Sequence, residues 1–144
     1  NELRDYLKNK EEDTIIIAPE ELLTKLLRKG FRKDSIITVE PNKKYMIQGM
    51  KFETIPAYNT NKQFHPKENG WVGYIIEIKG VRYYIAGDTD ITEENRRVKC
   101  DVAFVPVGGT YTMDFKEAAI VGTKQDAIDF SKLLHPEIKC EILI

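Results

Sequence analysis

The most informative stretch of the sequence is VRYYIAGDTD, residues 81–90. Its apolar part, residues 81–86, predicts a buried β-strand. Asp88 directly follows Gly87 at the predicted strand end, so its carboxylate can project into a cavity beyond the sheet, where a metal ion or an attacking water would lie. Two other interpretations stay open, because Gly-Asp pairs also form ordinary turns and because Asp88 or Asp90 could cap a short helix predicted just downstream.

A second apolar run, VAFVPV at residues 102–107, predicts another buried strand, and it leads into the glycine-rich segment GGTYT, residues 108–112. Two adjacent core strands whose polar ends point the same way predict a site built on strand termini. Gly109 could bring the backbone close to a ligand, or it could only form a tight turn. Tyr111 could reach into a cleft, although tyrosine is also common at half-buried edges.

The composition of the chain predicts a single globular domain over residues 1–144. The content of 42% hydrophobic and 31% charged residues excludes bulk disorder. The formal net charge of −1 gives no field that would attract nucleic acid or anionic lipid. No apolar run approaches the roughly 20 residues that cross a bilayer, and no signal peptide opens the chain. With two isolated cysteines, we therefore expect a cytoplasmic, reduced location.

Around the two central strands, the sequence predicts a mixed α/β layered fold, because hairpin signals dominate its middle and strands alternate with helices elsewhere. A stripe of four leucines at helical spacing in the first full helix predicts packing into the core. No Gly-x-Gly-x-x-Gly motif follows a strand, so dinucleotide binding is not indicated. The predicted helices cover residues 1–10, 20–29, a short segment from about 92, and 123–134; the predicted strands cover residues 14–18, 35–39, 44–47, 51–55, 73–78, 81–86, 102–107 and 138–144.

The chain contains only two histidines. His65 lies in a polar loop, residues 59–70, where it could bind a metal or substrate or could simply be solvated. His135 precedes a proline at a predicted helix end, where an imidazole interacts favourably with the helix dipole, so we expect it to be structural. A hydrolytic metal site needs several imidazoles and carboxylates that converge, and two histidines cannot build a histidine-rich dinuclear centre.

Five segments together resemble the metallo-β-lactamase superfamily, and within it the predicted metal-dependent hydrolases similar to L-ascorbate-6-phosphate lactonase. They occur in the family's order and at family-like spacing, from Thr14 to about Ala119. The segments are IPAYN at 55–59, FHPK at 64–67, GWVGY at 70–74, AGDTD at 86–90 and VPVGGTYTM at 105–113.

The resemblance implies an αββα sandwich with two divalent metal ions, zinc or manganese, at one edge of the β-layers. The family's Gly-Asp aspartate bridges both metals, which implies that Asp88 is the bridging and catalytic ligand. His65 would be a further metal ligand, while Asn59, Gly109 and Tyr111 would border the substrate cleft. The metal pair would lower the pKa of a shared water and supply hydroxide at neutral pH.

Three departures from the family pattern make the domain incomplete. The first family metal motif, His-x-His-x-Asp-His, is absent. Asn59 stands at the usual histidine of the third motif, a form that close relatives share and for which His65 could compensate. A strand that carries a ligand histidine is missing between Ala119 and Ile120. The polypeptide is either an internally deleted relative or only part of a longer protein. We favour the second, because losing these strands would expose long β-edges and a wide apolar face.

We therefore expect a metal-dependent hydrolase that adds metal-activated water to an ester, lactone or phosphoester of a small molecule. The 144-residue chain by itself is expected to be inactive. The alternative is a non-catalytic, degenerate module of the same fold that lacks a complete metal site. Nuclease or RNA-processing activity is disfavoured by the near-neutral charge, and no membrane partner is expected. Incomplete β-edges make a homo-oligomer plausible.

Overall fold

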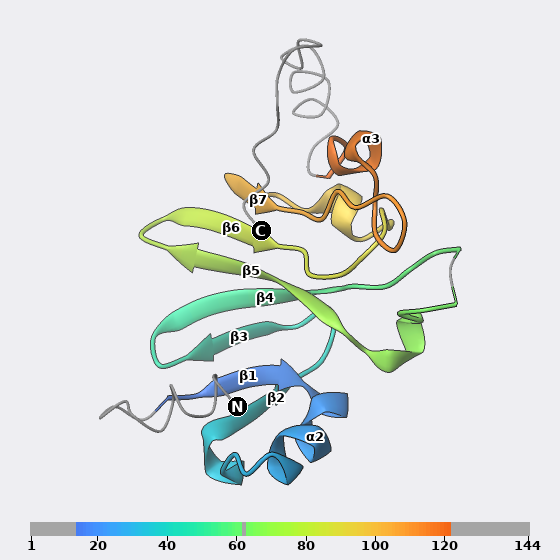
Figure 1. Ribbon diagram of the computed structural model, residues 1–144. Coiled ribbons are helices and arrows are strands. Elements are labelled where there is room, and N and C mark those ends of the chain that lie inside the picture. The colour runs from blue at the N-terminus through green and yellow to red at the C-terminus, as the bar shows by residue number, and fades with distance from the viewer. Residues whose placement is uncertain (1–13, 62, 122–144) are drawn as a thin grey trace.

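The computed structural model describes residues 14–61 and 63–121. A five-stranded sheet has the order β3–β4–β5–β6–β7, and β1 and β2 form a second sheet beside it (Figure 1). The strands are β1 (Ile16–Pro19), β2 (Ile36–Val39), β3 (Lys44–Ile47), β4 (Met50–Pro56), β5 (Val72–Ile78), β6 (Val81–Ile85) and β7 (Val102–Phe104). The helices are α2 (Leu23–Arg28), α3 (Phe115–Ala118) and the short 3-10 turns η1 (Glu20–Leu22), η2 (Lys33–Ser35), η3 (Lys67–Asn69) and η4 (Asn95–Arg97).

The strands β3 to β6 form an antiparallel meander. Its two tight turns, Gln48-Gly49 and Lys79-Gly80, have left-handed φ angles at both central residues, of 48° and 78° and of 51° and 80°. This conformation matches the twist of the flanking strands, which is why short hairpins favour it. Antiparallel pairs thus dominate the middle of the chain, and the predicted mixed α/β architecture is confirmed.

The carboxyl ends of β4, β6 and β7 all lie at one edge of the sheet. β4 and β6 both run antiparallel to β5, and β7 runs parallel to β6. Three loops leave the sheet at this edge, one after each of these strands: residues 57–71, 86–101 and 105–114. The topology therefore brings three segments together that are far apart in the sequence.

The two faces of the five-stranded sheet support separate apolar clusters. On one face, Phe52 and Val72 pack against Val39 of β2, with Ile17 of β1 at the border. On the other face, Ile75, Tyr84, Ala86 and Val98 form a second buried cluster. β1 and β2 lie at the β3–β4 side of the sheet, so only this side of the first face is covered by them (Figure 1).

The prediction of a buried strand over residues 102–107 is wrong in both length and burial. β7 ends at Phe104, and all three of its residues are exposed. Phe104 pairs with Ile85, and the two side chains are 57% and 42% exposed. They belong to the same sheet face as Phe52, but they lie beyond the reach of β1 and β2. The apolar sequence of β7 thus marks a surface that no described residue covers.

The predicted helix over residues 20–29 divides into η1 and α2, and Pro19 ends β1 and precedes η1 instead of opening a long helix. None of the residues of α2 is buried, and Leu27 is 39% exposed. The predicted core packing of the leucine stripe is therefore not borne out. No helix in the described part of the chain is long and apolar enough to cross a bilayer. The predicted elements at residues 1–10, 123–134 and 138–144, together with His135, fall outside the described residues.

Candidate functional site

An open pocket of about 520 Å³ lies at the sheet edge from which the three loops emerge. Its volume falls in the range typical of small-molecule sites, roughly 300–1,000 Å³. The pocket brings together four of the five candidate site residues predicted from the sequence, namely Asn59, His65, Asp88 and Tyr111. The fifth, Gly109, is not among the lining residues. The described lining residues are Asn59, Gln63, Phe64, His65, Pro66, Asn69, Trp71, Asp88 and Tyr111.

Asp88 and His65 are in direct polar contact in the pocket wall. Nε2 of His65 lies 2.9 Å from Oδ2 of Asp88, and the two side chains are 29% and 48% exposed. The edge of the His65 ring also meets Trp71, with ring centroids 4.3 Å apart. His65 is therefore not a solvated loop histidine, and the carboxylate of Asp88 faces the pocket.

The loop that carries Asp88 is tied to the loop after β4 by the two residues that follow it. The backbone N–H of Asp90 donates to the carbonyl of Tyr58 (3.0 Å), and the Oγ1 of Thr89 accepts from the N–H of Tyr58 (3.2 Å). The carboxylate of Asp90 accepts from the N–H of Thr60 at 3.0 Å. Asp90 thus joins the two loops and does not cap a helix. This bracing fixes the place from which Asp88 reaches His65.

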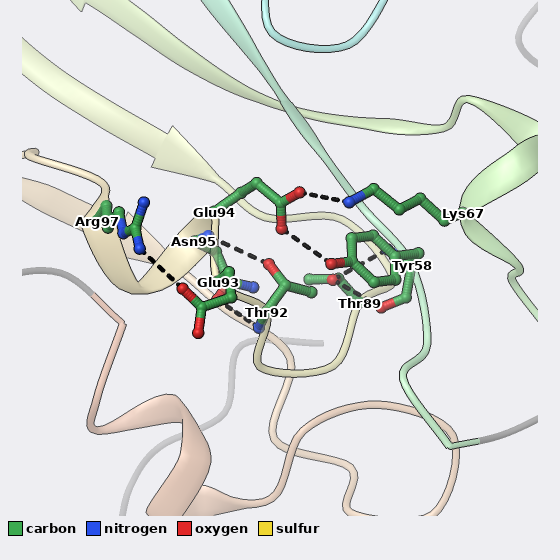
Figure 2. A network of polar contacts seen from close by, with 8 residues as sticks. All are labelled: Tyr58, Lys67, Thr89, Thr92, Glu93, Glu94, Asn95 and Arg97. Atoms are coloured by element: carbon green, nitrogen blue, oxygen red, sulfur yellow. Dashed lines mark hydrogen bonds and ion pairs between the residues drawn. The ribbon is translucent and has the colours of Figure 1, made fainter.

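The helix predicted near Thr92 is the 3-10 turn η4, and Thr92 bonds to its first residue, Asn95. The N–H of Asn95 donates to Oγ1 of Thr92 (3.1 Å), while Oδ1 of Asn95 accepts from the N–H of Thr92 (2.8 Å), as Figure 2 shows. The Asn95 amide also donates to the carbonyl of Asp90 at 2.8 Å. Because Asn95 is fully buried, these bonds hold the loop in one conformation.

Glu94 anchors the outer side of the same loops. Its carboxylate accepts from the hydroxyl of Tyr58 (2.9 Å) and pairs with the ammonium of Lys67 (2.6 Å; Figure 2). Burial opposes ionisation of Glu94, but Lys67 and Tyr58 outweigh it and lower the pKa of the carboxyl. Burial and the neighbouring Glu94 raise the pKa of Tyr58. The ammonium of Lys67 therefore pairs with Glu94 and also lies over the Tyr58 ring, with Nζ 4.7 Å from the ring centroid.

Asn59 is buried, with 6% of its surface exposed, although it carries a polar side chain. Its backbone N–H donates to the carbonyl of His65 at 2.8 Å, which closes the loop. Neither Oδ1 nor Nδ2 of its amide has a hydrogen-bond partner among the described residues. A buried amide left unpaired is costly, and such groups in native proteins usually have a partner. The Asn59 amide therefore marks a place where a further group belongs.

The donor atoms of the pocket fit one side of a metal site without completing it. Asp88 offers a carboxylate, His65 an imidazole and the unpaired Asn59 an amide oxygen, all of which are ligand types for divalent metals. Within residues 14–61 and 63–121, however, no three His, Cys, Asp or Glu side chains form a group that could hold a metal ion. A two-metal centre would therefore need ligands from outside these residues.

Gly109 adopts a φ of 72°, and its N–H donates to the carbonyl of Met113 at 3.1 Å. Of the two roles left open for it, the tight turn is the one that the structure shows. Tyr111 lies in this turn and meets Phe64 edge to face, with ring centroids 6.2 Å apart. Both rings are 63% exposed, so they form an aromatic rim at the pocket mouth.

Apart from Asn59 and Tyr111, sequence reasoning missed the aromatic and amide residues of the pocket as site residues. Phe64 and Asn69 lie in the same loop as His65, and Trp71 ends it just before β5. A signal was present, because large aromatic side chains are unusual in an otherwise polar loop and mark binding surfaces. The placement of Trp71 against His65 depends on the left-handed backbone at His65, with a φ of 58°, which the sequence does not indicate.

Comparison with known proteins defines the class to which this fold and pocket belong. Residues 4–125 match the model of the family described as the Beta-lactamase superfamily domain, and the chain belongs to this family. The mixed α/β fold agrees with that of solved structures in the same class.

Among curated proteins, the chain is similar to several named UPF0173 metal-dependent hydrolases. The one from Thermococcus onnurineus is 33% identical over 78 residues, which cover 51% of this chain and 35% of that protein. The one from Cupriavidus metallidurans is 40% identical over 70 residues, which cover 45% of this chain and 23% of that protein. The matched region thus spans about a third or less of these relatives.

Two solved structures show the same relationship. A candidate metal-dependent hydrolase from Parabacteroides distasonis is 35% identical, with a TM-score of 0.64, and the match covers 76% of this chain and 49% of that one. Igni18, a metallo hydrolase from Ignicoccus hospitalis, is 22% identical with a TM-score of 0.63 and shares the fold, over 83% of this chain and 52% of that one. The chain therefore spans about half the length of these structures.

Proposed function

We propose that this chain forms part of a metal-dependent hydrolase that acts on an ester, lactone or phosphoester of a small molecule. The observation that carries the proposal is the Asp88–His65 pair beside the unpaired amide of Asn59, in a pocket of about 520 Å³ at the sheet edge. Carboxylate, imidazole and amide donors that converge at strand ends are the groups that hydrolytic metal centres use. The relatives named as metal-dependent hydrolases support this reaction class.

In this proposal the complete protein binds two divalent cations, zinc or manganese. When bound, the cations supply a hydroxide at neutral pH and stabilise the developing oxyanion. Asp88 and His65 hold the cations together with ligands from outside the described residues, and Asn59 contributes its amide oxygen to a cation or to the substrate. The aromatic rim of Phe64 and Tyr111 receives the part of the substrate that does not react.

The resemblance to L-ascorbate-6-phosphate lactonase favours a lactone among the three ester types. The non-catalytic module is the weaker candidate, because the pocket keeps its donor groups and the named relatives are hydrolases. We further propose a small-molecule substrate, a cytoplasmic location and self-association through the uncovered β7 edge. Sedimentation velocity over a range of protein concentrations tests the last of these.

Metal titration followed by thermal unfolding tests the proposal. A cation that binds the folded chain raises its melting temperature by mass action. We expect zinc or manganese to raise the melting temperature of the full protein by several degrees and Asp88→Ala to abolish the rise. Asp34→Ala, an exposed carboxylate that pairs with Arg32 far from the pocket, is the matched control and should keep the rise. A rise that persists in Asp88→Ala contradicts the proposed metal site.

The intact mass of the natural polypeptide tests whether ligands come from a longer protein. A mass well above that of these 144 residues supports the proposal, and ester and lactone hydrolysis should then be assayed with the full protein. A mass that matches the 144 residues favours the non-catalytic module.

A further inference from the structure

We propose that Trp71 is a positioning residue that holds the imidazole of His65 against Asp88. Its indole is in turn anchored by Glu21. The inference rests on the proposed hydrolase function, in which His65 and Asp88 are metal ligands. Glu21 lies in η1, which follows β1 of the smaller sheet, whereas Trp71 directly precedes β5 of the larger one. The smaller sheet is thereby coupled to a site that is built on the larger sheet.

The first argument is the backbone conformation of His65. Its φ of 58° lies in the left-handed region, which residues with a Cβ seldom adopt. Such a conformation persists only where the surrounding contacts impose it, and it is frequent at functional sites. One of these contacts is the hydrogen bond from the N–H of Asn59 to the carbonyl of His65, at 2.8 Å. This bond fixes the backbone of His65 but does not restrict rotation of the imidazole, so the side chain needs a contact of its own.

The second argument is the contact that the imidazole makes with Trp71. The two ring centroids are 4.3 Å apart and the ring planes are inclined by 65°. In this arrangement Nε2 of His65 lies 2.9 Å from Oδ2 of Asp88. The contact with Trp71 therefore favours the rotamer in which Nε2 faces Asp88. Groups that orient a metal-binding side chain in this way strengthen metal binding without touching the metal.

The third argument is that Trp71 is held at both its backbone and its side chain. Its carbonyl accepts from the N–H of Ala57 at 2.9 Å, next to the pairing of β4 with β5. Its indole Nε1–H donates to the carboxylate of Glu21. Hydrogen bonds from Lys25 and from Trp71 lower the pKa of Glu21, so the acceptor of the indole is a charged carboxylate. Because a hydrogen bond to a charged acceptor is stronger than one to a neutral group, Glu21 can anchor the indole.

The test uses the full protein and two readouts. The first is NMR of the metal-free protein with labelled histidine, which observes the Nε2–H proton of His65. This proton is protected from exchange with water while Asp88 accepts it, and its signal is assigned by its loss in His65→Gln. The second readout is zinc affinity, measured by competition with a chromophoric chelator. We expect Glu21→Ala to abolish the protected signal and to weaken zinc binding by about tenfold.

Matched variants separate the indole contact from the other bond of Glu21. Lys25→Ala removes the ion pair of Glu21, at 2.6 Å, but leaves the acceptor of the indole, so both readouts should stay at their wild-type values. Glu21→Gln keeps a side-chain oxygen that can accept from the indole and should restore both readouts. Trp71→Phe keeps a ring but removes the donor, so it should reproduce the losses of Glu21→Ala. Adding Glu21→Ala to Trp71→Phe should cause no further loss, because both changes break one bond.

The inference is overturned if the wild type shows no protected signal, or if Glu21→Ala keeps the signal or the zinc affinity of the wild type. It is also overturned if Lys25→Ala loses as much as Glu21→Ala, or if Glu21→Gln restores nothing. A lower melting temperature with both readouts intact would assign Glu21 to stability alone.

The two readouts also separate this inference from the proposed function. A protected signal that disappears in Glu21→Ala, in a protein that binds no zinc, supports the positioning of His65 and overturns the metal site. Intact readouts in Glu21→Ala, together with zinc-dependent ester hydrolysis, overturn the positioning and support the hydrolase.

Discussion

The edge of the sheet from which the pocket loops emerge, here called the site edge, and the β6–β7 side of the sheet are stabilised in different ways. At the site edge, the loops are joined by buried hydrogen bonds, and Thr89, Asp90, Thr92 and Asn95 are each 2% exposed or less. On the β6–β7 side, apolar side chains such as Phe104 lie in the open, with no described residue over them. Hydrogen bonds between the loops themselves stabilise the pocket wall. The apolar face of β6 and β7, in contrast, is not covered by any described residue.

This difference shows that the two regions depend on different kinds of contact. Polar loops bonded to one another need no external surface, because these bond partners lie in the loops themselves, after β4 and after β6. An apolar sheet face is stabilised only when another layer removes it from water. Predictions that compare the two regions therefore test both the loops of the site and the exposure of the β6–β7 sheet face.

The largest expected difference is in the free energy of unfolding of two variants, each of which removes a phenylalanine from the same sheet face. Phe52 is 3% exposed and stacks on Tyr45, so Phe52→Ala should lower the free energy of unfolding by about 3–5 kcal/mol. Phe104 is 57% exposed, so Phe104→Ala should cost less than about 1 kcal/mol. Urea unfolding measures both. Equal losses would mean that the β7 side is covered in solution.

The next effect lies in the loops of the site edge. Asn95→Ala removes two buried side-chain hydrogen bonds, to Thr92 and Asp90, and should lower the free energy of unfolding by about 2–3 kcal/mol. Arg96→Ala, an exposed neighbour, is the control and should change it by less than about 0.5 kcal/mol. If Asn95→Ala lowered the free energy of unfolding as little as the control does, the buried hydrogen bonds of Asn95 would not stabilise these loops.

Gly73 tests the packing of β5 beneath the end of β6. A Cβ at this position would lie 2.7 Å from the carbonyl oxygen of Ala86 and 2.8 Å from that of Ile85. Gly73→Ala must therefore displace the strand end that leads to Asp88, at a cost of about 1–3 kcal/mol in thermal or urea unfolding. A Cβ at Gly108 would lie 3.2 Å from Oγ1 of Thr112 and no backbone atom is as close, so Gly108→Ala should cost less than Gly73→Ala. Unchanged stability in Gly73→Ala would show that the strands separate easily.

The smallest effect is pH-dependent and concerns Glu94. Lys67 and Tyr58, against the opposing effect of burial, hold the folded-state pKa of Glu94 below its ordinary value of 4.5. Its stabilising contribution is therefore complete well above pH 4.5 and is lost as the pH falls through the folded-state pKa. Glu94→Gln should cost about 1 kcal/mol at pH 7, and the difference from wild type should shrink toward pH 3. A difference that stays constant across this range would show that the charge of Glu94 contributes nothing.

Much of the fold could be predicted from local sequence signals. The hairpin signals in the middle of the chain indicated the meander correctly, and its tight turns lie at Gln48-Gly49 and Lys79-Gly80. The exposure of β7 among the described residues could not be predicted, because an apolar run indicates a tendency to be buried and not which segment of the protein covers it. The same reason explains the half-buried leucines of α2.

For the site, the sequence indicated the right strand ends but not the contacts between them. The placement of Asp88 beyond β6 followed from the apolar run that precedes Gly87. Its pairing with His65 depends on bonds between loops that are about 30 residues apart, such as that from Asp90 to Tyr58, and no local pattern encodes these. The aromatic rim likewise depends on two loops meeting.

The turn-linked meander also has a consequence for the order of folding. The β3–β4 and β5–β6 hairpins are local, so they can form within microseconds, whereas β5 must close the loop of residues 57–71 to pair with β4, and β7 must close a connection of 16 residues to pair with β6 in parallel. We expect the two hairpins to form first and the strand pairs that position the pocket loops to form later. The pocket is thus a late product of folding, and a ligand that fills it would slow unfolding by holding the last-formed segment in place.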